Sequence, residues 1–101
     1  MTPWEREFYT ETGRRIRAAR KAKGMRQSAL AEAVGLTRTS IVNIEAGKQK
    51  MLMHTLLGIE STLGAEHLSL VPRGGRMERD ILHVQSRNFK PTHGSASEER
   101  K

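Results

Sequence analysis

The sequence predicts a small, all-α domain, and three observations support this prediction. Apolar residues recur every three or four positions from the N-terminus to about residue 63, which is the period of an amphipathic helix. Glycines divide this stretch into short segments, as expected for residues that follow the ends of helices. The chain has only 101 residues and no cysteine, so we expect neither a second large domain nor a disulfide framework.

The first helix is expected to begin at residues 2–5, whose sequence Thr-Pro-Trp-Glu is a capping box with proline at the first helical position. The helical spacing continues to Lys23, and Gly24 follows as a C-cap. Gly13 leaves a second possibility open, in which the helix restarts at Thr10.

Three shorter helices are expected after the first, at residues 27–34, 38–46 and 52–63. Thr37 is the expected N-cap of the third helix, and a glycine follows each of the three. The helical period places nine of their residues on inward faces, namely Leu30, Ala31, Val34, Ile41, Ile44, Met53, Leu56, Ile59 and Leu63.

The connection between the second and third helices is the most informative part of the chain. Two short helices joined by a turn of three or four residues containing glycine form a helix-turn-helix. Ala31 is small where the helices approach each other, Gly35 tolerates the positive φ of the turn, and Leu36 fills the angle between the helices. An ordinary helical hairpin would explain these residues, but not the polar residues of the third helix.

Positive charge is concentrated in the same part of the chain. The net charge is +7 overall, and residues 14–50 alone carry +8. A polyanion is the partner that such a patch attracts, although a plain solvated basic face would have the same composition.

Residues 16–64 resemble the lambda-repressor/Cro-type (XRE-like) helix-turn-helix family. The resemblance rests on positions in all four expected helices and in the turns that follow them, namely Ile16, Arg20, Gly24, Gln27, Leu30, Ala31, Gly35, Leu36, Thr37, Ile41, Ile44, Glu45, Gly47, Leu63 and Gly64. The sequence departs from the family pattern at Met51, where proline is frequent, and at Glu60, where a small apolar residue is usual. The family implies a lambda-repressor-like fold of four to five short helices that binds double-stranded DNA.

The resemblance implies that the outer face of the third helix lies in the major groove. A helical wheel places Arg38, Thr39, Val42 and Asn43 on that face. Arg38 can donate to guanine, Asn43 can pair with adenine, and Thr39 or Val42 can contact a thymine methyl group. Contacts with phosphate are expected from Gln27, Thr37, Ser40, Lys48 and Lys50.

The family also forms an internal ion pair at the positions of Arg20 and Glu45. We therefore expect these two residues to join the first helix to the third, and not to contact bases.

The pattern changes after Gly64, because Leu68 and Leu70 alternate with polar residues in the segment 66–71. This two-residue period favours a short strand that would pair with the same strand of a second copy, although a fifth helix starting at Glu66 is the alternative. The segment resembles the dimerising end of HipB-type antitoxins.

The sequence is therefore divided into residues 1–13, an extension or the start of the first helix; residues 14–72, the DNA-binding domain with its dimerising end; and residues 73–101, a flexible basic tail. The tail is either a solvated extension or a segment that folds on a partner. The second interpretation depends on its apolar residues Met77, Ile81, Leu82, Val84 and Phe89.

Other functions lack the residues that they need. The four histidines are irregularly spaced and cysteine is absent, so neither a metal site, a cofactor site nor a catalytic centre is expected. No apolar segment reaches the length of a membrane span, which favours a cytoplasmic protein. The family resemblance implies a nucleoid-associated protein of a bacterium or phage. The exposed face lacks stacking aromatic residues, which disfavours RNA.

The sequence thus predicts a homodimeric repressor that binds a palindromic operator in its own operon, and we expect it to be the antitoxin of a toxin–antitoxin pair. The alternatives are a phage-type repressor, a restriction-modification controller, and a toxin-neutralising protein-binding module for which DNA contact is secondary.

Overall fold

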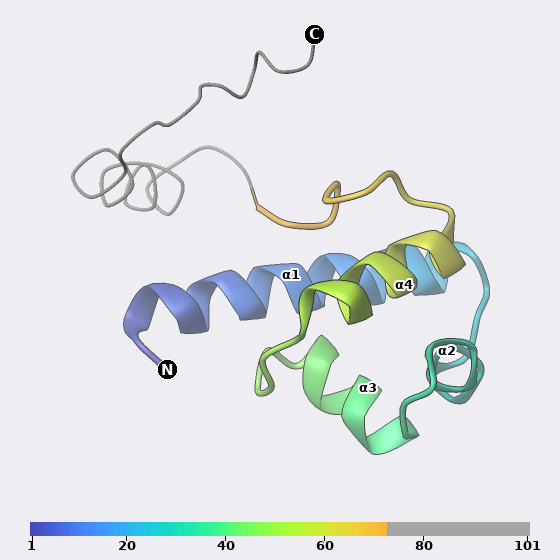
Figure 1. Cartoon of the computed structure of the whole chain (residues 1–101), viewed down its shortest axis with the longest axis horizontal. Coiled ribbons are helices and arrows are strands. Elements are labelled where there is room, and N and C mark those ends of the chain that lie inside the picture. The colour runs from blue at the N-terminus through green and yellow to red at the C-terminus, as the bar shows by residue number, and fades with distance from the viewer. Residues whose placement is uncertain (73–101) are drawn as a thin grey trace, which may run out of the picture.

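The computed structural model describes residues 1–72, and this part of the chain contains four helices. The helices are α1 (Pro3–Ala22), α2 (Gln27–Val34), α3 (Arg38–Glu45) and α4 (Met53–Leu63). The long α1 lies beside α4, while α2 and α3 lie on one side of this pair (Figure 1). The all-α prediction is therefore confirmed for the described residues.

The N-terminus of α1 has the expected capping box. The Thr2 hydroxyl accepts a hydrogen bond from the Glu5 amide at 3.2 Å, and the Glu5 carboxylate accepts one from the Thr2 amide at 2.7 Å. From there α1 continues unbroken to Ala22, so a restart at Thr10 does not occur.

Gly13 lies within the continuous helix α1, at the point where α1 crosses α3. A Cβ atom at Gly13 would collide with the carbonyl oxygen of Ile44 and would lie 2.7 Å from the carbonyl oxygen of Glu45. Only glycine allows the two helix backbones to cross at this separation.

The shorter helices follow the predicted boundaries to within one residue. The Thr37 hydroxyl accepts a hydrogen bond from the Ser40 amide at 3.1 Å and so caps α3. Gly35 and Gly64 end α2 and α4 in the left-handed conformation, with φ values of 73° and 74°.

A single core holds the four helices together. It consists of buried residues from every helix, namely Ile16, Leu30, Ala31, Ile41, Ile44, Leu56, Ile59 and Leu63. Val34 and Leu36 pack against this core at its edge. The predicted inward position of Met53 is wrong, because this side chain lies outside the core at the first residue of α4 and is 65% exposed.

Residues 66–71 form neither the preferred strand nor the alternative fifth helix, but a series of turns. The buried carboxylate of Glu60 accepts hydrogen bonds from the backbone amides of Leu68 at 2.6 Å and Leu70 at 3.0 Å. Leu68 has a φ of 64°, so the backbone turns there instead of extending. The departure from the family pattern at Glu60 thus organises this turn. The predicted tail, residues 73–101, lies outside the described residues.

No helix among residues 1–72 is both long and apolar enough to cross a membrane.

Candidate nucleic-acid interface

The α2–α3 connection presents one face of α3 to solvent. The Leu36 amide donates to the Ala31 carbonyl at 2.9 Å and closes the turn. Ile41 and Ile44 are then 0% and 1% exposed and anchor the inner face of α3 in the core. On the outer face Arg38 and Thr39 are exposed, and Val42 and Asn43 are partly exposed. The four expected base-contacting side chains therefore share a surface.

Thr37 and Ser40 are already bonded to each other at the start of α3. Besides accepting from the Ser40 amide, the Thr37 hydroxyl donates to the Ser40 hydroxyl at 3.2 Å. Both hydroxyl groups lie at the positive end of the α3 dipole, a position that favours anions.

A buried ion pair fixes the position of α3 against α1. The Arg20 guanidinium donates to both oxygens of the Glu45 carboxylate, from Nε at 2.6 Å and from Nη2 at 3.0 Å, and its Nη1 donates to the Met25 carbonyl at 2.8 Å. The two side chains are only 8% and 3% exposed. The bonds to Glu45 raise the pKa of Arg20 above its ordinary value.

Gln27 has a different contact from the one expected. Its side-chain amide donates to Glu45 Oε1 at 3.1 Å, so it extends the ion pair to α2. Glu45 consequently joins three helices. No side chain caps α2, so the N–H groups of its first turn remain suited to an anion.

Lys48 and Lys50 are exposed in the loop between α3 and α4. Lys50 Nζ lies 3.6 Å from a carboxylate oxygen of Glu5, which partly neutralises its charge. The pKa of Glu5 is lowered, mainly by the hydrogen bond from the Thr2 amide and less by Lys50.

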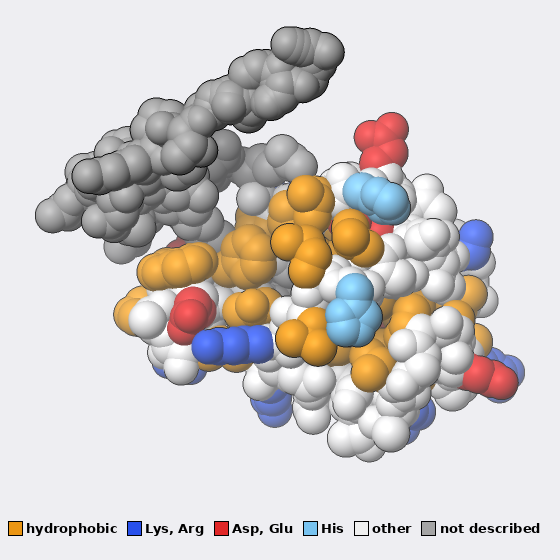
Figure 2. Space-filling view, in the orientation of Figure 1, with side chains coloured by type: hydrophobic (Ala, Val, Ile, Leu, Met, Phe, Trp, Pro, Cys, Tyr) orange, Lys and Arg blue, Asp and Glu red, His pale blue; other side chains and the backbone are white. Residues whose placement is uncertain are grey.

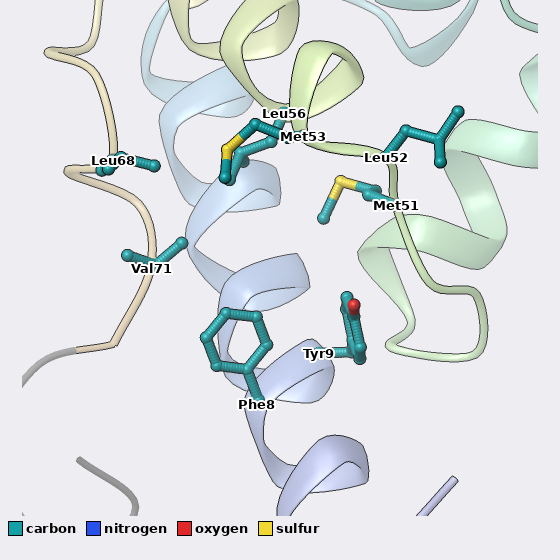
Figure 3. A pocket seen from close by; sticks show the side chains of 8 residues that line it. All are labelled: Phe8, Tyr9, Met51, Leu52, Met53, Leu56, Leu68 and Val71. Carbon is teal, nitrogen blue, oxygen red and sulfur yellow. The ribbon is translucent and has the colours of Figure 1, made fainter. Parts of the chain in front are cut away.

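The residues expected to dimerise lie apart from this interface and differ from each other in exposure. Leu68 is 37% exposed, whereas Leu70 is half-buried and packs against the core. Leu68 belongs to an apolar groove with a volume of about 350 Å³, lined by Phe8, Tyr9, Met51, Leu52, Met53, Leu56, Leu68 and Val71 (Figure 3). Hydrophobic side chains accordingly gather on the face seen in Figure 2.

This groove was not predicted from the sequence, because its walls come from α1, the end of the α3–α4 loop, α4 and the turn after α4. The adjacent apolar residues Leu52 and Met53, at an expected helix start, were the available signal. They are 67% and 65% exposed in the structure.

Residues 1–72 contain no group of three or more histidine, aspartate or glutamate side chains that could hold a metal ion.

Known proteins share this arrangement of helices. The family model HTH_3, described as helix-turn-helix, matches residues 16–70. The restriction-modification controller protein C.AhdI from Aeromonas hydrophila is 31% identical, with 61% of this chain and 90% of that chain covered and a TM-score of 0.59. The hypothetical transcription factor NHTF from Neisseria is 21% identical, covers 79% of this chain and 87% of that chain at a TM-score of 0.62, and supports the fold alone.

An enzyme also shares the fold over part of its length. The hydroxypropylphosphonic acid epoxidase of S. wedmorenis is 25% identical, with 67% of this chain but only 36% of the epoxidase covered and a TM-score of 0.63. This match shows that the epoxidase contains a similarly folded segment, and it carries no conclusion about enzymatic activity. No curated protein sequence matches the chain significantly.

Proposed function

This chain is a DNA-binding transcriptional regulator of the helix-turn-helix family HTH_3, and we propose that it represses its own operon by binding a palindromic operator as a homodimer. The observation that carries the proposal is the outer face of α3, which presents an arginine and an asparagine beside Thr39 and Val42. Arginine and asparagine are the side chains that form two-bond contacts with guanine and adenine.

In this proposal α3 enters the major groove, and its four outer residues contact base edges. Arg38 donates to guanine O6 and N7, Asn43 pairs with adenine, and Thr39 and Val42 contact thymine methyl groups. The Arg20–Glu45–Gln27 network supports this arrangement because it locks α3 to α1 and α2 before DNA is bound.

The contacts with phosphate surround α3. Thr37 and Ser40 act at its N-terminus, while Lys48 and Lys50 act after its C-terminus. Gln27 acts mainly through the α2 backbone, because its side chain is held by Glu45.

The second copy is proposed to dock on the apolar groove that includes Leu68. The groove is a hollow flanked by the projecting side chains of Leu52 and Met53, so the same patch offers both halves of a self-complementary contact. Leu70 contributes to this contact indirectly, because it packs against the core and so anchors the turn that carries Leu68. A two-fold dimer would place two α3 helices about 34 Å apart, one helical turn of DNA.

A binding assay with the DNA upstream of the gene tests this function. We expect tight binding to that duplex, much weaker binding to a scrambled duplex, and affinity that falls steeply with salt because several phosphates are contacted. Arg38→Ala should cost about 1–3 kcal/mol on the operator and relax the preference at one base pair. Equal losses on operator and scrambled DNA would show that Arg38 does not contact a base.

We further propose that the operon encodes a toxin and that this chain is its antitoxin. The support is the tail, whose apolar residues have no assigned role within the DNA-binding domain. The strand that was expected to pair two antitoxin chains is replaced by turns, so the proposal now depends on the tail alone.

A restriction-modification controller is the second candidate, favoured by the 31% identity to C.AhdI over 90% of that chain. Co-expression with the neighbouring gene separates the two. Rescue from a toxic neighbour by the full chain, but not by a chain ending at Pro72, would support the antitoxin. A harmless neighbour would reject it, and a methyltransferase gene beside this one would favour the controller.

A further inference from the structure

One face of α1 carries Arg6, Thr10, Gly13 and Arg17, spaced so that they line up along the helix. This face crosses the C-terminal end of α3. Gly13 abuts the carbonyl groups of Ile44 and Glu45, as described above. Thr10 lies against the following loop, because a Cβ atom at Gly47 would be 2.6 Å from its Cα.

Two recesses lie on the two sides of this crossing. The first has a volume of about 210 Å³ and is lined by Arg17, Gln27, Val42, Glu45 and Ala46. The second has a volume of about 400 Å³ and is lined by Met1, Arg6, Thr10, Ala46, Gly47 and Lys48. Because both include Ala46, the C-cap of α3, α1 presents one arginine on each side of the end of α3.

The side chains of Arg6 and Arg17 make fewer hydrogen bonds and ion pairs than those of the other arginines of α1. Arg14 and Arg15 both donate to the Glu11 carboxylate, and Arg20 is bound to Glu45. The side chain of Arg17 is exposed and makes no hydrogen bond or ion pair within residues 1–72. The Arg6 side chain makes a single long hydrogen bond of 3.4 Å, from its guanidinium to the Met1 carbonyl.

The residues beside the two arginines indicate that a polyanion is the ligand of both recesses. Arg17 shares its recess with Gln27 at the start of α2, and Arg6 shares its recess with Lys48, so each lies beside a proposed phosphate contact. Glu45 also lines the first recess, but its charge is already matched by Arg20.

We infer that Arg6 and Arg17 bind backbone phosphates of the DNA on the two sides of the base pairs that α3 contacts. The inference rests on the proposed function and extends it to α1, which neither the motif nor the family pattern assigned to DNA binding. The planar guanidinium suits this role because it can donate two parallel hydrogen bonds to one phosphate.

Titration of labelled duplexes over a series of salt concentrations tests the inference. Arg6→Ala and Arg17→Ala should each weaken binding about tenfold per protomer, the loss of one charge-assisted hydrogen bond, on both operator and scrambled DNA. Each should also lower the slope of log affinity against log salt by about one per protomer. Arg6→Lys and Arg17→Lys should retain the slope but lose part of the affinity.

Arg14→Ala is the matched control, because it removes the same charge from the same helix at a side chain already held by Glu11. Wild-type melting temperatures would establish that the exposed substitutions leave the fold intact. Arg6→Ala and Arg17→Ala variants that behave like Arg14→Ala would overturn the inference, as would losses confined to operator DNA. Wild-type protein that binds operator and scrambled DNA equally would instead reject the proposed function.

Discussion

Gly13 and Gly58 are both glycines inside helices, and their surroundings assign them opposite roles. A Cβ atom at Gly13 meets the α3 backbone, whereas at Gly58 the nearest atom is Val34 Cγ1 at 3.7 Å, an ordinary contact. We expect Gly13→Ala to destabilise the fold by about 1–3 kcal/mol or more, because the helices must move apart. Gly58→Ala should stabilise it by about 0.5–1 kcal/mol, because alanine favours the helix.

Urea denaturation of the two variants measures both effects. Equal stability of Gly13→Ala and wild-type protein would mean that α1 and α3 do not cross as closely as the structure has them.

Glu45 is the residue on which the position of α3 depends most. Removing its carboxylate leaves the Arg20 guanidinium nearly buried without its partner and also releases Gln27. Glu45→Ala should therefore cost about 3–5 kcal/mol of stability and should weaken DNA binding at the same time. Glu32→Ala, which removes an exposed carboxylate from α2, is the control.

A Glu45→Ala protein that melts like wild type but fails to bind DNA would contradict this structural role. Thermal melting and a binding titration on the same preparation distinguish the two outcomes.

At the scale of elements, Glu11 connects α1 to the turn after α4. It holds Arg14 and Arg15, and Arg15 also donates to the Val71 carbonyl at 3.1 Å. These bonds from Arg14 and Arg15 lower the pKa of Glu11 from 4.5 to about 2. Because the folded state binds this proton less readily than the unfolded state, the contribution of Glu11 is complete above pH 4.5 and is lost as the pH falls toward 2.

We therefore expect Glu11→Gln to be less stable than wild type at neutral pH, and this difference to disappear near pH 2. Melting temperatures across the acid range check the prediction. A difference that grew as the pH fell would have the wrong sign.

Helix boundaries were predictable because their causes are local in the sequence. The capping box at Thr2, the N-cap at Thr37 and the glycine after α4 each act within a few residues. The segment 66–71 was not predictable in this way. Its alternating pattern favours a strand, but a carboxylate six residues before it, on a helix, binds two of its amides.

Some side-chain contacts were likewise not predicted, because they join residues that are far apart in the sequence. The family pattern predicted that Arg20 would meet Glu45, and the structure contains this ion pair, but nothing in the pattern indicated that Gln27 would join it. The apolar groove likewise combines α1, the α3–α4 loop, α4 and the final turn, so only the folded chain brings its walls together.

At the scale of the whole molecule, the charged surface around α3 and the apolar groove imply two different partners. Met53 lies at the rim of the groove, 65% exposed and on the first residue of α4. An aspartate there would place a negative charge at the positive end of the helix dipole, so Met53→Asp should fold at least as well as wild type. The same charge would oppose burial against a second copy, because an unpaired buried carboxylate is costly.

Met53→Asp should therefore be monomeric at concentrations where the wild-type protein is a dimer. It should also bind a full palindromic operator no more tightly than a single half-site, because one protomer contacts only half of the phosphates and bases. Sedimentation equilibrium and titration of both duplexes measure these effects, with Ala18→Asp on the exposed side of α1 as the control. A dimer that persists in Met53→Asp, with undiminished preference for the palindrome, would place the dimer contact on another face of the molecule.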